Sequence, residues 1–211
     1  MKMNKKLLLL TSIVILFPIL WGVMIWSQFP NQIPIHFNVA GQANDFQSKP
    51  LAVFGLPIFL LLVHLFVIFV TARDPKNQTM NEKMGKVIYW LAPIISLSLS
   101  YLIYSKALGS TTNPSIFVSA LLGLIFVMMG NYMPKLKVNH TVGIRLPWTL
   151  QSEDNWHKTH RLAGKLWVLG GLILLLDAGL QFAVPYVMEG VILAIVLIPI
   201  LYSYKISRKN R

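Results

Sequence analysis

The chain has 211 residues, of which 55% are hydrophobic and only 12% are charged, whereas soluble domains contain about 45–50% apolar and roughly 25% charged residues. This composition leaves too little charge to cover a soluble globule, so the net charge of +12 needs an explanation other than a soluble nucleic-acid-binding protein. The absence of cysteine excludes disulfides, thiolate metal sites and cysteine nucleophiles.

Six long apolar blocks predict an all-α integral membrane protein with six transmembrane helices. About 20 mostly apolar residues span the hydrocarbon as a helix, and the blocks are continuous rather than alternating as in membrane barrels. The blocks are Leu7–Trp26, Leu51–Thr71, Val87–Leu108, Pro114–Met133, Leu166–Val184 and Val187–Tyr204. The start resembles a signal peptide, but no small-residue cleavage site follows it, so we expect a retained first helix. A very short turn around Pro185 predicts an antiparallel hairpin of the last two helices.

The positions of Lys and Arg predict that both termini are cytoplasmic. With the N-terminus inside, only Lys49 and Lys106 fall on the outer side, and cytoplasmic loops of membrane proteins carry an excess of Lys and Arg. The same asymmetry explains the basic composition without a nucleic-acid partner. The predicted cytoplasmic segments are Met1–Lys6, Ala72–Lys86, Pro134–Lys165 and Lys205–Arg211.

The sequence predicts one membrane domain with two parts. Residues 1–133 form a four-helix membrane portion with an extracellular loop at 27–50, and residues 134–211 form a cytoplasmic loop followed by a two-helix hairpin. Ser152, which precedes two acidic residues, is a typical N-cap. We therefore expect one long helix that begins in the cytoplasm at Glu153 and continues into the fifth span.

The outer loop contains a segment with two prolines and alternating apolar residues, which predicts a short strand or a loop that follows the membrane surface. Two interpretations remain open: a tether packed on the helix ends, or a surface for an extracellular ligand. The candidate ligand-facing residues are Pro34, His36, Asn38, Gly41 and Asp45.

The inner loop is too rich in Trp, Ile and Leu for a disordered linker. Gly143 permits a turn, and Trp148, Trp156 and Trp167 suit the interfacial belt of a membrane protein. The loop is either a membrane-surface anchor or a cytosolic docking surface.

Glu153, His157 and His160 share one helical face. Such a set could bind a metal ion, but it equally fits a solvated polar face, and we predict neither a metal site nor a cofactor.

Polar side chains also fall within the predicted spans. Asp177 lies near the middle of the fifth helix and His64 lies in the second helix, nearer the inside. A buried carboxylate in a membrane is costly and usually has a purpose. It can be neutral and bonded to a neighbouring helix, or it can serve a proton or ion path. No nucleophile–base set, GxSxG motif or P-loop is present, so we do not expect an enzyme.

The inner loop resembles the signature of the SdpI family. The motif residues are Gly130–Pro134, Asn139–Leu150, Ser152, Glu153, Trp156, Thr159–Arg161, Gly164 and Lys165. Pro34–Asn38, Gly41, Asp45 and Lys49 of the outer loop resemble a second module that is often found ahead of this signature.

The resemblance implies a bacterial immunity and signal-transduction protein in the plasma membrane. The founding member protects a spore-forming bacterium from its own secreted toxic peptide, and it holds a small transcriptional repressor at the membrane when toxin is present. The implied partner-binding residues of the cytoplasmic loop are Asn139, Gly143, Arg145, Pro147, Trp148, Glu153, Trp156, His160 and Arg161.

The leading hypothesis is therefore a non-enzymatic membrane immunity protein. Its expected partners are the lipid bilayer, a secreted peptide toxin and a cytosolic transcriptional repressor, with no direct contact to nucleic acid. The alternative is a transporter of small solutes, ions or protons in which His64 and Asp177 line a polar path.

The charge distribution generates a test of topology. Reporter domains fused after Lys49 or Lys106 should report an outer location, and fusions after Lys86, Lys165 or Arg211 an inner one, because Lys and Arg are retained in the cytoplasm. Two reporter enzymes are fused at each position, one that is active only outside the cell and one that is active only in the cytoplasm. The measurement is the ratio of their activities. A cytoplasmic signal at Lys49 would refute the predicted orientation.

Overall fold

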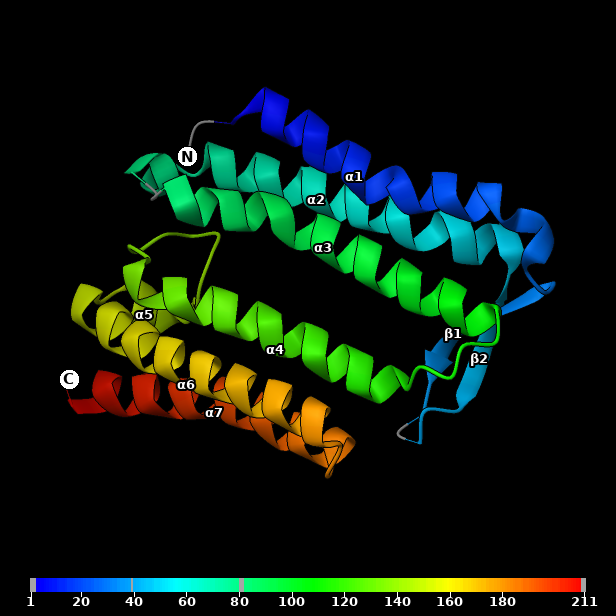
Figure 1. The fold of residues 1–211 in the computed structure, drawn as a ribbon. Helices are drawn as coiled ribbons and strands as arrows, with labels where there is room; N and C mark the ends of the chain where they lie inside the picture. Colours follow the sequence, from blue (N-terminus) through cyan, green and yellow to red (C-terminus); the bar gives the residue numbers. More distant parts are fainter. Residues whose placement is uncertain (1–2, 39, 80–81, 210–211) are drawn as a thin grey trace. The chain divides into compact units, whose positions relative to one another are not determined.

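A computed structural model of the chain describes residues 3–38, 40–79 and 82–209, and its helices and strands are labelled in Figure 1. The outermost residues of the two predicted cytoplasmic termini lie outside this described part. The long helices are α1 (Lys5–Met24), α2 (Leu56–Arg73), α3 (Glu82–Ala107), α4 (Pro114–Tyr132), α6 (Glu153–Leu180) and α7 (Val184–Lys209). The remaining elements are β1 (Gln32–Phe37), β2 (Ala43–Ser48), a π-helical turn at Leu51–Gly55, the short helix α5 (Pro147–Leu150) and 3-10 turns at Trp26–Gln28, Pro75–Thr79 and Met133–Lys135.

Six helices in the described part are long and apolar enough to cross a membrane, which confirms the predicted number of spans. The chain is thus a multi-pass membrane protein by the length and composition of its helices. The expected long helix from Glu153 is also confirmed, because α6 continues without a break to Leu180. At its start, the Ser152 side chain accepts a hydrogen bond from Asn155 N–H. Pro185 lies within the first turn of α7 rather than in the connection, since the first turn tolerates a residue without an N–H.

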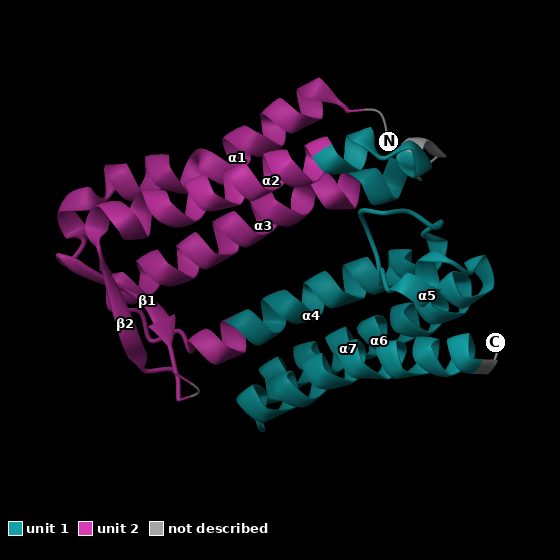
Figure 2. Ribbon diagram, turned by 180° about the vertical axis from the view of Figure 1, so that it is seen from behind, with its two compact units in different colours: residues 1–2, 70–85, 118–211 teal, residues 3–69, 86–117 magenta. Residues whose placement is uncertain are grey.

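The chain divides into two compact units, coloured separately in Figure 2. The N-terminal unit comprises residues 3–69 and 86–117, and the C-terminal unit comprises residues 70–85 and 118–211 within the described part.

In the N-terminal unit, the outer loop forms an antiparallel hairpin of β1 and β2. The register runs from Gln32 opposite Ser48 to Phe37 opposite Ala43, with irregular pairing near His36. Ile33 of the predicted strand is fully buried in a cluster with Val53 and Tyr104. The second strand was not predicted, because its sequence lacks apolar alternation and most of its side chains are exposed.

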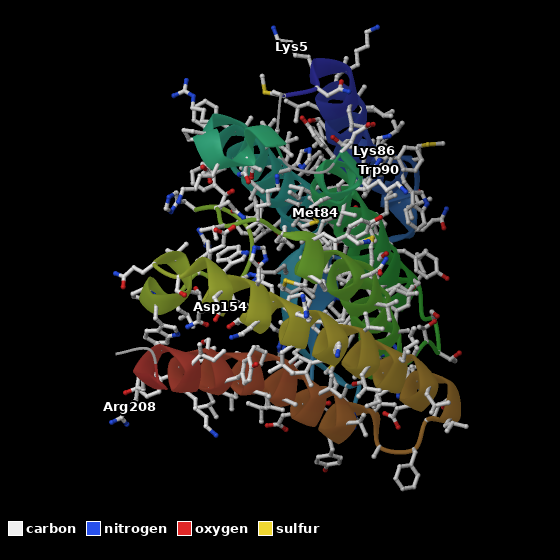
Figure 3. All side chains as sticks on the ribbon, turned by 90° about the vertical axis from the view of Figure 1, so that its left-hand side faces the viewer. Lys5, Met84, Lys86, Trp90, Asp154 and Arg208 are labelled. Carbon is white, nitrogen blue, oxygen red and sulfur yellow. The ribbon has the colours of Figure 1, made fainter. Side chains whose placement is uncertain are left out.

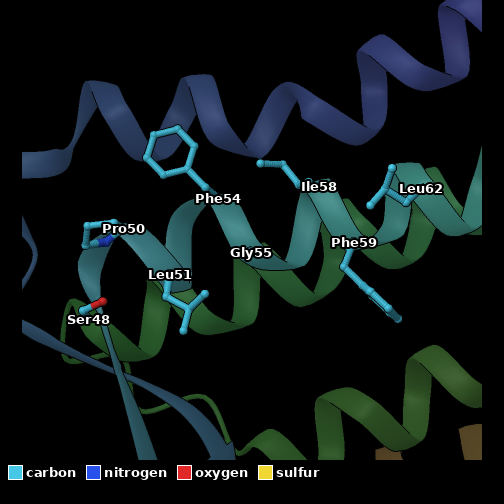
Figure 4. A pocket seen from close by; sticks show the side chains of 8 residues that line it. All are labelled: Ser48, Pro50, Leu51, Phe54, Gly55, Ile58, Phe59 and Leu62. Carbon is cyan, nitrogen blue, oxygen red and sulfur yellow. The ribbon is translucent and has the colours of Figure 1, made fainter.

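An open apolar groove follows the first turns of α2 (Figure 4). Phe54 and Ile58 point to one side of the helix, and Leu51 and Phe59 point to the other. Because the groove lies on a membrane-spanning helix and is almost wholly apolar, contact with lipid acyl chains is enough to account for it.

In the C-terminal unit, α4 and α6 pack through two pairs of glycines. A Cβ added to Gly171 would lie 2.6 Å from the Gly123 carbonyl oxygen, and one added to Gly123 would lie 2.9 Å from the Gly171 oxygen. Gly130 and Gly164 show the same relation, at 2.9 and 2.8 Å. Small residues allow membrane helices to approach this closely, because lipid offers no hydrophobic force to hold them together.

These pairs predict the effect of a single methyl group. Gly171→Ala should lower the stability of the detergent-solubilised protein by about 1–3 kcal/mol, because the methyl group meets backbone atoms that cannot rotate away. The matched control is Gly179→Ala on the same helix, where a Cβ meets nothing within 4 Å. Tryptophan-fluorescence melting measures both variants. Equal melting temperatures would show that the glycine pairs are not a tight contact.

Candidate functional site

The inner loop after α4 is folded rather than extended, and Asn139 organises its first turn. The Asn139 Oδ1 atom accepts hydrogen bonds from Thr141 N–H at 2.9 Å and Val142 N–H at 2.7 Å. Its Nδ2 group donates to the carbonyls of Lys137 and Val142. The side chain is 2% exposed. Asn139 therefore shapes the loop from within and is not available to a partner.

A second predicted cytoplasmic segment, which follows α2, is joined to this loop. Asp74 Oδ2 accepts a hydrogen bond from His140 N–H at 2.8 Å, and Asp74 Oδ1 accepts one from Lys76 N–H at 3.0 Å. The buried Asn77 side chain donates to Thr141 Oγ1. The two segments thus lie on the same side of the C-terminal unit. Sequence reasoning missed this contact, although an Asp before a Pro is a signal for a turn.

His160 forms the centre of the loop. Its Nε2 atom accepts a hydrogen bond from Ile144 N–H at 2.9 Å, so the ring proton lies on Nδ1, which donates to the Trp156 carbonyl at 2.8 Å. The ring stacks on Trp156 with centroids 3.9 Å apart, and both side chains are fully buried. Trp156 Nε1 in turn donates to the Leu136 carbonyl at 2.8 Å. The interfacial-belt prediction is therefore wrong for Trp156, which is a core residue of the loop.

The face shared by Glu153, His157 and His160 divides into two environments. His157 lies 3.5 Å from the exposed Glu153 carboxylate, while both nitrogens of His160 are already bonded inside the loop. Within the described residues, no three His, Asp or Glu side chains converge as metal ligands. The solvated-face interpretation therefore fits the first two residues, and His160 serves the loop.

The short helix α5 fastens the loop to α7. Trp148 Nε1 donates to Ser203 Oγ at 3.0 Å, and its ring packs edge-on against Tyr204 at 5.4 Å. Asn155 Nδ2 donates to the Ser203 carbonyl, also at 3.0 Å. Thr149 is fully buried, where its hydroxyl donates to the Ile144 carbonyl at 2.8 Å. No local sequence pattern indicates the role of Ser203, because its partners are distant in the chain.

Only some of the expected partner-binding residues remain exposed. The exposed side chains are those of Arg145, Pro147, Glu153 and Arg161. Arg145 Nη1 donates to the His140 carbonyl at 2.6 Å, while the Glu153 carboxylate lies beside His157. The other predicted residues of the loop hold this surface in place.

In the outer hairpin too, some of the expected ligand-facing residues are exposed and others are structural. Pro34 is buried, which contradicts its expected ligand-facing role. Asn38 Oδ1 accepts hydrogen bonds from Ala40 and Gln42 N–H groups, and Gly41 has a φ of 75°, so Asn38 and Gly41 build the turn. His36 and Asp45, opposite each other in the register, are exposed.

The two polar residues of the predicted spans each have a local contact. His64 Nε2 lies 2.9 Å from Thr11 Oγ1 inside the N-terminal unit. In the C-terminal unit, Asp177 lies in the last turn of α6 rather than near its middle, because the helix ends at Leu180. Asp177 Oδ1 accepts a hydrogen bond from Ala183 N–H at 3.2 Å, which ties α6 to the start of α7. The contact of Asp177 fits the structural interpretation through Oδ1 alone, because Oδ2 is buried without a hydrogen-bond partner among the described residues.

Gly143 provides a test of the loop core. Its φ is 114°, and an added Cβ would lie 2.5 Å from His160 Nε2. Gly143→Ala should therefore loosen the loop and speed tryptic cleavage after Lys137 and Arg145, since backbone strain alone costs about 1–3 kcal/mol. The matched control is Gly109→Ala, which has a positive φ of 85° but no atom within 4 Å of its Cβ. Equal cleavage of the two variants would contradict the proposed role of the His160 contact.

Comparisons with known proteins show which sequences this loop is similar to. Residues 135–203 match the SdpI/YfhL protein family, and residues 13–61 match a domain of unknown function, DUF1648. Over 170 residues, 79% of this chain and 78% of the relative, the sequence is 26% identical to Immunity protein SdpI of Bacillus subtilis (strain 168). No solved structure matches the chain. The predicted resemblance is confirmed, because the match to the SdpI/YfhL protein family covers the inner loop, α6 and most of α7.

Proposed function

We propose that this chain is a membrane immunity protein that protects a bacterium from a secreted peptide toxin. The observation that carries the proposal is the similarity to Immunity protein SdpI, which extends over 79% of the chain and therefore well beyond the family region at residues 135–203. The apolar helices support a membrane location, and the similarity to a Bacillus protein supports the bacterial plasma membrane. Protection would be a binding function, in which no group of this chain reacts with the toxin.

The outer hairpin is the proposed contact for the toxin. His36 and Asp45 expose their side chains on neighbouring strands, and His36 Nδ1 lies 2.7 Å from Asn44 Oδ1. The hairpin is anchored beneath by Ile33, which is fully buried against the helices of its unit. A polar surface on a fixed base suits recognition of a peptide at the membrane surface.

The inner loop is the proposed contact for a cytosolic partner, such as a transcriptional repressor. Its docking surface consists of Arg145, Pro147 and Glu153, which are exposed around the short helix α5. His160 and Asn139 hold the backbone beneath with hydrogen bonds inside the loop. Because this backbone is already ordered, a partner would not have to bear the entropic cost of folding it.

Survival under toxin tests the immunity function directly. A sensitive bacterium that expresses the chain should survive a panel of secreted peptide toxins better than cells with an empty vector. The panel includes the peptides secreted by the species that carries the gene, and a membrane-fraction blot confirms insertion. Equal killing of both strains by every peptide, at confirmed expression, would refute the proposal.

Arg145→Lys tests the docking surface separately from protection. The readout is a reporter gene under the control of the proposed repressor, which the toxin should induce. We expect the variant to insert normally but to lose this induction, because lysine keeps the charge but cannot reproduce the planar guanidinium contacts. The control is Lys137→Arg, another charge-preserving exchange at an exposed residue of the same loop. Trp148 is unsuitable for this purpose, since its removal would detach α5 from α7. Wild-type induction by Arg145→Lys would leave the loop as a membrane anchor.

A further inference from the structure

One outward face of α6 changes from charged to apolar along its length. Residues on this face recur every three or four positions, so they lie in one row along the helix. The first half of the row is Asp154, Lys158, Arg161 and Lys165, all exposed. The second half is Leu169, Leu172, Leu176 and Leu180, which are 57%, 52%, 64% and 70% exposed. Leucines this exposed on a membrane-spanning helix face lipid.

The row also indicates depth in the bilayer. Lys165 precedes Leu180, the last residue of α6, by about 22 Å at 1.5 Å per residue, whereas the hydrocarbon is about 30 Å thick. Phe182 and Tyr186, which follow the end of α6, are 87% and 74% exposed. Exposed aromatic residues at the end of a membrane-spanning helix are typical of the membrane–water interface. Lys165 therefore starts within the hydrocarbon thickness and extends its ammonium group toward the headgroups, as long basic side chains do. Arg161 lies one turn further out.

Arg161 and Lys165 differ from their neighbour Lys158 in their ionic contacts. Lys158 Nζ lies 2.7 Å from Asp154 Oδ2 on the same row, at the start of α6 where Figure 3 labels Asp154. Among the described residues, no carboxylate lies within ion-pair distance of Arg161 or Lys165. A cation beside hydrocarbon is costly unless an anion compensates it.

We propose that Arg161 and Lys165 bind the phosphate of an anionic phospholipid whose acyl chains lie along Leu169 and Leu172. The two basic residues are one turn apart, so both side chains reach one phosphate from the same face. Lipid fits this position better than a soluble acidic protein, because the exposed Leu169 follows one turn below Lys165 and requires an apolar neighbour. This assignment removes Arg161 from the cytosolic docking surface, and it does not depend on the immunity function.

Native mass spectrometry of the full chain, with added phosphatidylglycerol or phosphatidylcholine, measures this binding. Arg161→Gln/Lys165→Gln should bind phosphatidylglycerol roughly 25-fold more weakly, from about fivefold for each basic residue near an anionic lipid surface. The matched control is Lys135→Gln/Lys137→Gln, which removes the same charge from exposed loop residues outside this row. We expect the control to retain the lipid, and phosphatidylcholine to bind weakly to every variant.

Further arms keep the outcome decisive. Arg161→Lys/Lys165→Arg should retain the lipid, which guards against a double variant that merely misfolds. Inorganic phosphate should not displace the lipid, because it lacks acyl chains for Leu169 and Leu172. Equal lipid loss in the double variant and its control, unchanged binding in the double variant, or displacement by inorganic phosphate would each overturn the proposal. The proposal would also be overturned if the double variant kept its lipid but lost binding to a soluble acidic protein.

Discussion

The contact on which the C-terminal unit depends is the backbone-to-backbone approach of α4 and α6 at Gly123–Gly171 and Gly130–Gly164. It fixes the rotation of α6 about its own axis, because only the glycine side of each helix permits this distance. Gly164 also lies against Pro134, where a Cβ would meet the ring at 2.7 Å. The same contact therefore fixes where the inner loop begins, which face of α6 that loop covers and which face is left to lipid.

The inner loop follows a second constraint, that buried polar groups need hydrogen-bond partners. His160, Trp156 and Asn139 satisfy backbone groups that would otherwise be buried without a partner. Many residues of the family motif thus encode the shape of the loop and do not themselves form a recognition surface. A contact with another molecule is left to the smaller set that remains exposed, such as Arg145 and Glu153.

Local patterns in the sequence were sufficient for the spans, the Ser152 cap and the turn at Gly143, because each depends on residues near one another in the chain. Burial could not be read in the same way. Trp156 looked interfacial and proved to be enclosed by a loop that begins twenty residues earlier. The links from Asp74 to His140 and from Trp148 to Ser203 join distant segments, and neither periodicity nor capping signals report such pairs.

The length of α6 has a consequence for anything that binds at its start. A helix from Glu153 to Leu180 is about 42 Å long, and the hydrocarbon accounts for about 30 Å of it. For a helix along the membrane normal with Leu180 at the far boundary, the surplus would place Glu153 and the adjoining loop roughly 12 Å above the acyl chains. A protein bound there would not contact the lipid and would need no membrane affinity of its own. It would therefore leave the membrane as soon as it dissociated from the surface around Glu153.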